Sequence, residues 1–271
     1  MGERIDPERP DLIRRAGAEA LGAFALVFAG CGAIVTNAHT HGALGAVGVS
    51  LVFGLVILAG IAALGHVSGA HFNPAVTFSF LLTRHLPRRD ALAYVAAQLI
   101  GAVLAALLLW AVWPGRPADL GATVPSIAAG RAFIVEAVMS GLLMLVIVSV
   151  ATDTRAVGSP AALAIGATIA LDALFGGPLT GASMNPARSF APALVSGQWR
   201  DFWVYLAGPL VGAPLGALAY QLVRGEDTAR GQATVRGELD VRGDSIGEGA
   251  SAPRDEPPGP PVVGVNMEQF G

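Results

Sequence analysis

Two short segments carry the residues whose chemistry is most specific. Ser68–Ala75 reads Ser-Gly-Ala-His-Phe-Asn-Pro-Ala, and Thr180–Ala187 reads Thr-Gly-Ala-Ser-Met-Asn-Pro-Ala. The second copy starts 112 positions after the first (180 − 68). An Asn amide can donate a hydrogen bond to a passing oxygen, and Asn is also a strong helix N-cap, while Pro is favoured in the first helical turn. Each segment therefore predicts a helix that begins at Asn-Pro, with a hydrogen-bonding side chain at its N-terminus.

A short apolar run follows each Asn-Pro-Ala, at residues 76–82 and 189–195. That length is about half of a membrane span. Two such half-helices entering from opposite sides meet at the bilayer midplane with their partly positive ends together, a field that repels cations. The simpler alternative is a pair of ordinary helix N-caps in a bundle.

Irregular backbone at membrane depth is tolerated only where it is buried or lines a watery path. The loops at residues 68–72 and 180–184 are therefore expected to offer carbonyl groups to a pore. The expected pore carbonyls belong to Gly69, Ala70, His71, Gly181 and Ser183. The expected pore midplane comprises Asn73, Pro74, Ala75, Asn185, Pro186 and Ala187.

The rest of the chain repeats with nearly the same offset. Residues 97–107 align with residues 208–218 at a shift of 111 (208 − 97), and six of these eleven positions are identical. An acid lies in an apolar run near the start of each half, Glu19 in the first and Glu136 in the second. Intramembrane carboxylates are often functional, so proton coupling is one interpretation. Their matched positions favour another, in which each accepts hydrogen bonds from backbone N–H groups of a loop.

The composition indicates an integral membrane protein. The chain is 53% hydrophobic and 14% charged, with a mean hydropathy of +0.58, which is too apolar for an ordinary soluble domain. Six stretches are long enough to span a bilayer, three in each half: roughly Ala16–Thr36, Ala43–Leu64, Ala91–Trp113, Arg131–Ala151, Pro160–Leu179 and Phe202–Val223. Three spans per copy reverse the polarity of the second copy. The expected fold is an all-α inverted repeat of six transmembrane helices and two re-entrant half-helices.

The arginines predict the orientation, since all 17 basic residues are Arg. With the N-terminus inside, the cytoplasmic arginines are Arg4, Arg9, Arg14, Arg15, Arg84, Arg88, Arg89, Arg155 and Arg224. Those outside or in the pore are Arg116, Arg131, Arg188 and Arg200. We therefore expect a multi-pass protein of the cell membrane, plasma or bacterial inner, with both termini cytoplasmic. The first span is interpreted as a retained helix, not a signal peptide.

The chain divides into a channel domain and a tail. The domain covers residues 1–224, with repeat one at about 11–113 and repeat two at about 130–223. From Gly225 the composition changes to Gly, Pro and charged residues, which cannot form a core. Residues 225–271 are thus expected to be a disordered cytoplasmic tail, and an inert tail is favoured over a regulatory one.

Several classes of function find no support. The net charge of −3 does not suggest a nucleic-acid partner. The single cysteine, Cys31, has no disulfide partner, and its neighbours Gly30 and Gly32 point to helix packing. Two histidines in a short loop, His39 and His41, are too few for a metal site. No arrangement of nucleophile and base indicates an enzyme, and no cofactor or metal is expected.

These motifs resemble the aquaporin, or major intrinsic protein, family over about Asp11 to Arg224. The first loop matches the family pattern at Gly65–Val76 and the second at Asn185–Ser189. The resemblance implies a homotetramer in a lipid bilayer with one pore per subunit. The second half is most similar to plant nodulin-like intrinsic proteins and their bacterial relatives, which pass glycerol and metalloid hydroxyacids as well as water.

The resemblance also implies a narrow filter toward the outside, formed by Phe53, Ala173, Ala182 and Arg188. Strict water channels place His at the position of Ala173, so the loss of an imidazole is expected to widen this opening. Glycerol facilitators place Asp where Ser189 follows Arg188, and in this respect the chain is closer to water channels. Arg188 is expected to repel cations and to donate to a solute oxygen, and binding to loop carbonyls is a second role compatible with the first. Asp172 is expected in the outer vestibule, near lipid headgroups, or near neighbouring helix ends.

The sequence therefore predicts a passive channel for water and small uncharged solutes that excludes ions and protons. Glycerol is the main solute expected, and urea, ammonia and metalloid hydroxyacids such as arsenite are further candidates. A strictly water-selective channel is the first alternative. A secondary transporter, which also uses inverted repeats and broken helices, is a remote one.

Overall fold

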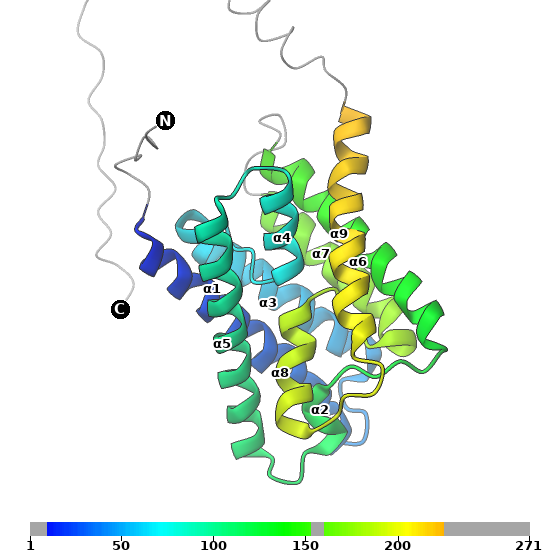
Figure 1. Cartoon of the computed structure of the whole chain (residues 1–271). Coiled ribbons are helices and arrows are strands. Elements are labelled where there is room, and N and C mark those ends of the chain that lie inside the picture. The colour runs from blue at the N-terminus through cyan, green and yellow to red at the C-terminus, as the bar shows by residue number, and fades with distance from the viewer. Residues whose placement is uncertain (1–9, 153–159, 225–271) are drawn as a thin grey trace, which may run out of the picture. The chain divides into compact units, whose positions relative to one another are not determined.

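The computed structural model describes residues 10–152 and 160–224, and the ordered elements in these ranges are all helical (Figure 1). The predicted tail at 225–271 and the cytoplasmic positions of Arg4, Arg9 and Arg155 lie outside the described residues. In chain order, the elements are α1 Leu12–Leu26, η1 Val27–Cys31, α2 Gly32–His39, α3 Gly45–Ser68, α4 Pro74–Leu82, α5 Arg88–Val112, η2 Pro117–Gly121, α6 Ala129–Thr152, α7 Pro160–Thr180, α8 Pro186–Ser196 and α9 Trp203–Arg224.

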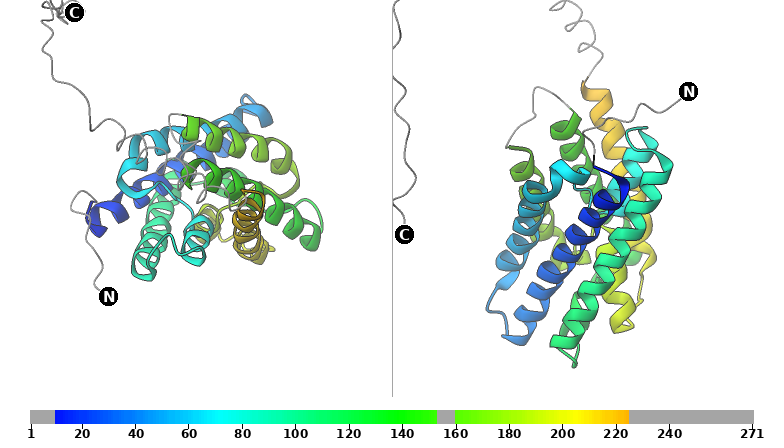
Figure 2. Two further views of the ribbon diagram at one scale, coloured as in Figure 1. Left: turned by 90° about the horizontal axis from the view of Figure 1, so that it is seen from above. Right: turned by 90° about the vertical axis from the view of Figure 1, so that its left-hand side faces the viewer.

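Six helices of the described chain are long and apolar enough to cross a membrane, which confirms the predicted number of spans. The first span runs from Leu12 to His39 and comprises α1, the π-helical turn η1 and α2. The other five are α3, α5, α6, α7 and α9. Figure 2 shows that these long helices are tilted across one another.

The short helices α4 and α8 enter the bundle from opposite ends, with their first turns toward its middle (Figure 1). Asn73 caps α4, because its Oδ1 accepts a 2.9 Å hydrogen bond from the N–H of Ala75. Asn185 caps α8 in the same way, with its Oδ1 3.0 Å from the nitrogen of Ala187. The predicted pair of re-entrant half-helices in an inverted repeat is therefore confirmed.

Glycine allows the long helices to approach closely at equivalent points of the two repeats. In α5, a Cβ atom on Gly101 would overlap the backbone of Ala20 in α1. In α9, a Cβ atom on Gly212, 111 positions later, would overlap the backbone of Ala137 in α6. Small residues at such crossings replace the hydrophobic driving force that is missing in lipid with close van der Waals packing.

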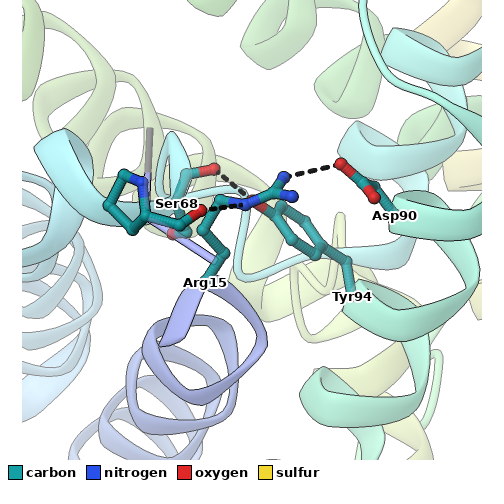
Figure 3. A network of polar contacts seen from close by, with 5 residues as sticks. Arg15, Ser68, Asp90 and Tyr94 are labelled. Carbon is teal, nitrogen blue, oxygen red and sulfur yellow. Dashed lines mark hydrogen bonds and ion pairs between the residues drawn. The ribbon is translucent and has the colours of Figure 1, made fainter. Parts of the chain in front are cut away.

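A polar cluster fixes the start of α1 and α5 to the end of α3 (Figure 3). Arg15 donates from Nη1 to Asp90 at 2.6 Å and from Nε to the carbonyl of Pro10 at 3.0 Å. Tyr94, one turn after Asp90, donates from its hydroxyl to the carbonyl of Ser68 at 2.8 Å. Because Ser68 is the last residue of α3, the cluster determines where the first loop begins.

Candidate functional site

Glu19 holds the first loop through its backbone. Its Oε1 accepts hydrogen bonds from the N–H of His71 at 2.9 Å and the hydroxyl of Ser68 at 2.7 Å. Its Oε2 accepts from the N–H of Phe72 at 2.7 Å and from Gln98 at 2.8 Å. The carboxylate is fully buried, and four donors satisfy it. Since the loop N–H groups point back at Glu19, the carbonyls of the same peptides are free to face the other way.

Glu136 holds the second loop in the same manner. It accepts from the N–H of Ser183 at 2.9 Å, the N–H of Met184 at 2.8 Å and the hydroxyl of Thr180 at 2.6 Å. It too is fully buried. The two acids therefore make equivalent contacts in the two repeats, down to the hydroxyl that precedes each loop.

Two tyrosines that the motifs did not indicate complete this arrangement. Tyr94 donates to the carbonyl of Ser68, and Tyr205 donates to the carbonyl of Thr180 at 2.6 Å. The tyrosines are 111 positions apart (205 − 94), the same shift that relates residues 97–107 to residues 208–218. This matched spacing is the feature of the sequence from which the role of the two tyrosines could have been predicted.

The two asparagines bond across the midplane as well as capping their helices. The Nδ2 of Asn73 donates to the carbonyl of Met184 at 2.8 Å, and the Nδ2 of Asn185 donates to the carbonyl of Phe72 at 2.9 Å. A side-chain amide has two N–H donors. Each asparagine therefore uses one of its two donors on the opposite loop, and both side chains line the cavity described below.

Each loop holds residues in the left-handed backbone region, which non-glycine residues rarely adopt. Ala70 and Phe72 in the first loop have φ of 51° and 49°, and Ala182 and Met184 in the second have 42° and 52°. Such strain concentrates at functional sites and persists where surrounding contacts impose it. Here the hydrogen bonds to the two glutamates and two asparagines impose it.

A cavity of about 610 Å³ runs along the two loops. Both asparagines line it. So do four of the five residues whose carbonyls were expected to face a pore: Gly69, Ala70, His71 and Ser183. Gly181 does not contribute to the wall, and neither do the residues behind the asparagines: Pro74, Ala75, Pro186 and Ala187. The four expected filter residues do line it: Phe53, Ala173, Ala182 and Arg188. The structure thus brings the four expected filter residues, which come from α3, α7, α8 and the second loop, to one cavity.

Arg188 is buried at 1% exposure and is fixed in two ways. Its Nη1 donates to the carbonyl of Gly121 in η2 at 2.8 Å. Its Cζ lies 5.1 Å from the ring centroid of Phe53, within the range of a cation–π contact. The guanidinium is therefore held to a loop carbonyl and also faces the cavity.

Among the histidines, His71 lines the cavity and is braced from the side. Its Nδ1 lies 3.1 Å from the hydroxyl of Thr77, and its ring stacks on Phe80 at 4.8 Å between centroids. His66 also contributes to the wall. No cluster of three metal-ligating side chains occurs in the part of the chain that the structure describes.

Two of the positions expected for Asp172, the outer vestibule and the lipid headgroups, were wrong. The residue is 0% exposed and does not line the cavity, so it lies neither in the vestibule nor at the lipid surface. Within residues 10–152 and 160–224, neither of its carboxylate oxygens has a hydrogen-bond partner. Consecutive positions of a helix point about 100° apart, so Asp172 is turned into the bundle while Ala173 lines the cavity.

Comparisons with known proteins agree with this architecture. The family model described as Major intrinsic protein matches residues 7–220. Aquaporin NIP1-1 of Oryza sativa subsp. japonica is 46% identical over 212 residues, covering 78% of this chain and 75% of that protein. Nodulin-26 of Glycine max is 46% identical over 210 residues, covering 78% of each. The X-ray structure of the aquaglyceroporin from Plasmodium falciparum superimposes with a TM-score of 0.68 at 29% identity, covering 78% of this chain and 96% of that one.

The predicted similarity to nodulin-like proteins is confirmed by these relatives. With the family model covering most of the described residues, the fold and the sequence agree on one assignment. The chain belongs to the major intrinsic protein family, whose members are multi-pass membrane channels for water and small solutes and not enzymes.

Proposed function

We propose that this channel passes glycerol and other small uncharged solutes as well as water, and excludes ions and protons. The observation that carries the proposal is the small size of two filter side chains, Ala173 and Ala182, opposite Phe53 and Arg188. Two methyl groups leave room that a histidine imidazole would fill. Metalloid hydroxyacids such as arsenite, urea and ammonia are further solutes of suitable size and charge.

The filter has two chemically different sides. Phe53 presents an apolar ring, suited to the carbon backbone of a polyol, and Arg188 presents N–H donors, suited to its hydroxyl groups. Arg188 also keeps a fixed positive charge beside the path, which raises the energy of any cation in the filter. The aquaglyceroporin from Plasmodium falciparum, which shares the fold, supports a polyol as the larger solute.

The midplane supplies the second barrier to ions. The remaining amide donors of Asn73 and Asn185 orient the oxygen of each molecule that passes. The N-termini of α4 and α8 add positive partial charges at the same level. A water molecule whose oxygen accepts hydrogen bonds from both asparagines has no lone pair left to accept one from a neighbouring water molecule, so the chain that a proton would follow is interrupted while neutral solutes pass.

Two alternatives are tested by the same experiment. A strictly water-selective channel would need a narrower filter than one lined by two alanines. A secondary transporter would need a bound ion or a titrating carboxylate beside the solute. Among the described residues, no Asp or Glu lines the cavity, and Glu19, Glu136 and Asp172 are buried away from its wall.

The test is stopped-flow light scattering on proteoliposomes that hold the purified protein, with protein-free liposomes as the control. Fast shrinkage in sucrose and fast re-swelling in glycerol support the proposal. Fast shrinkage without re-swelling identifies a strictly water-selective channel. Saturating, gradient-coupled flux identifies a transporter.

We further propose a homotetramer, both termini in the cytoplasm and a cell-membrane location. Large apolar side chains such as Leu21, Val47 and Leu55 are exposed on the bundle, as contact with lipid or other subunits requires. The channel domain is proposed to cover residues 1–224, with 225–271 as a disordered tail. Chemical cross-linking in membranes tests the tetramer, and protease cleavage of the C-terminus in inside-out vesicles tests the orientation.

A further inference from the structure

The first span contains a π-helical turn, η1, directly behind the filter. This turn, Val27–Cys31, interrupts the span between α1 and α2. A π turn adds one residue and rotates the helix that follows by about 100° relative to a regular helix. Such turns are rare and often lie at functional sites. Neither Gly30 nor Cys31 lines the cavity, but Gly30 packs against Phe53 of the filter, and Cys31 packs against Gly121, whose carbonyl accepts from Arg188 of the filter.

Gly30 sets the position of the Phe53 ring. A Cβ atom on Gly30 would lie 2.6 Å from both Cδ1 and Cζ of that ring and closer still to Cε1. Carbon atoms pack at about 3.5–4.0 Å, so the ring would have to move by about 1 Å. Since the ring also lines the cavity and lies 5.1 Å from Cζ of Arg188, we expect a displacement of the ring away from η1 to narrow the path.

Cys31 sets the position of the carbonyl that holds Arg188. Its thiol lies 3.8 Å from the carbonyl oxygen of Gly121, the same oxygen that accepts from Nη1 of Arg188. Gly121 has a φ of 78°, and a Cβ atom there would lie 2.8 Å from the Cβ of Cys31. The preceding residues Ala118 to Leu120 are also left-handed, with φ between 48° and 56°, so this turn is strained and depends on its packing.

We propose that η1 determines the aperture of the filter, with Gly30 and Cys31 as positioning residues that hold Phe53 and Arg188 from behind. The inference rests on the proposed filter and extends it to residues that no solute touches. The turn places two consecutive residues behind the filter, with Gly30 against the Phe53 ring and Cys31 against the Gly121 carbonyl that accepts from Arg188.

The test compares Gly30→Ala with Gly32→Ala in proteoliposomes. Gly32 is two positions away in the same span, and a Cβ there meets only Leu109, at an ordinary 3.4 Å. We expect Gly30→Ala to lower glycerol permeability about tenfold, the discrimination that one methyl group gives in a fitted pocket, and water permeability much less. The double variant Gly30→Ala with Phe53→Leu should have a higher glycerol permeability than Gly30→Ala alone, because leucine is smaller than the phenylalanine ring that it replaces. Equal permeabilities of Gly30→Ala and Gly32→Ala, or no rescue, overturn the proposal.

A second variant pair keeps the inference testable if Gly30→Ala does not assemble. Cys31→Ala removes the thiol from Gly121, whereas Cys31→Ser keeps a donor of similar size. We expect the ratio of glycerol to water permeability to change at least about twofold in Cys31→Ala and to stay at the wild-type value in Cys31→Ser. Identical ratios in wild type and both variants contradict the role of Cys31.

The outcomes also separate this inference from the proposed solute range. If the wild-type protein passes water and no glycerol, the proposed solute range is wrong. The inference then predicts a lower water permeability for Gly30→Ala than for Gly32→Ala. Addition of Phe53→Leu to Gly30→Ala should restore that water permeability. If the wild-type protein passes both solutes and Gly30→Ala matches Gly32→Ala, the filter proposal stands and the positioning role fails.

Discussion

Arg188, in the first turn of α8, donates a 2.8 Å hydrogen bond to the carbonyl oxygen of Gly121. The two residues are 67 positions apart, and Gly121 belongs to the connection between the two repeats. The cation beside the pore is therefore held by a segment that has no counterpart in the repeated motifs. The position of Arg188 therefore depends on this connection as much as on α8, which carries the residue.

Substitution of Arg188 by Val is expected to increase cation and proton leak. A unit charge at about 4 Å repels another by about 4 kcal/mol at an effective dielectric constant of 20, so loss of even a third of this barrier raises leak about tenfold. Proton flux into proteoliposomes with an internal pH dye measures the effect. Arg131→Val, at an exposed position outside the cavity wall, is the control. Ion exclusion unchanged in Arg188→Val would falsify the filter role.

Introduction of His at Ala173 is expected to lower glycerol permeability more than water permeability. The imidazole fills space beside Phe53 and Arg188 that the methyl group leaves open. A change of this size in a fitted opening corresponds to a selectivity change of about tenfold or more. Stopped-flow measurements of both solutes on one preparation give the ratio directly. Equal losses of the two permeabilities would remove the argument from filter size.

Replacement of Glu136 by Gln is expected to destabilise the second loop. The carboxylate accepts from Ser183 and Met184, and an amide group has one oxygen in place of two. One buried backbone N–H then lacks a partner, at a cost of about 1–3 kcal/mol. Thermal unfolding in detergent measures it, with the exposed Asp119→Asn as the control. An unchanged melting temperature in Glu136→Gln means that the loop does not depend on this acid.

Replacement of Asp172 by Asn is expected to stabilise the protein by about 1 kcal/mol, since burial without a hydrogen-bond partner penalises the ionised form of a carboxyl group and Asn carries no charge. Water permeability should stay at the wild-type value, because Asp172 does not line the cavity. The melting temperature and the water flux of the same preparation test both parts. A lower melting temperature would show that the carboxylate has a favourable interaction in the membrane.

The sequence by itself determined the architecture. Hydropathy located six spans because lipid requires long apolar helices, and the duplicated Asn-Pro-Ala located two helix starts because capping and proline preference act within one turn. Two copies with an odd number of spans then required an inverted repeat. These features are local or periodic, so they can be read along the chain.

Tertiary structure decided the contacts that join distant segments. The bond from Asn73 to Met184, the burial of Asp172 and the packing of Cys31 on Gly121 follow from helix tilt and from the way the loops fold back. The π turn at 27–31 likewise has no sequence signature that we recognised. Which face of a helix turns inward depends on all of its neighbours at once, and no short stretch of sequence specifies that.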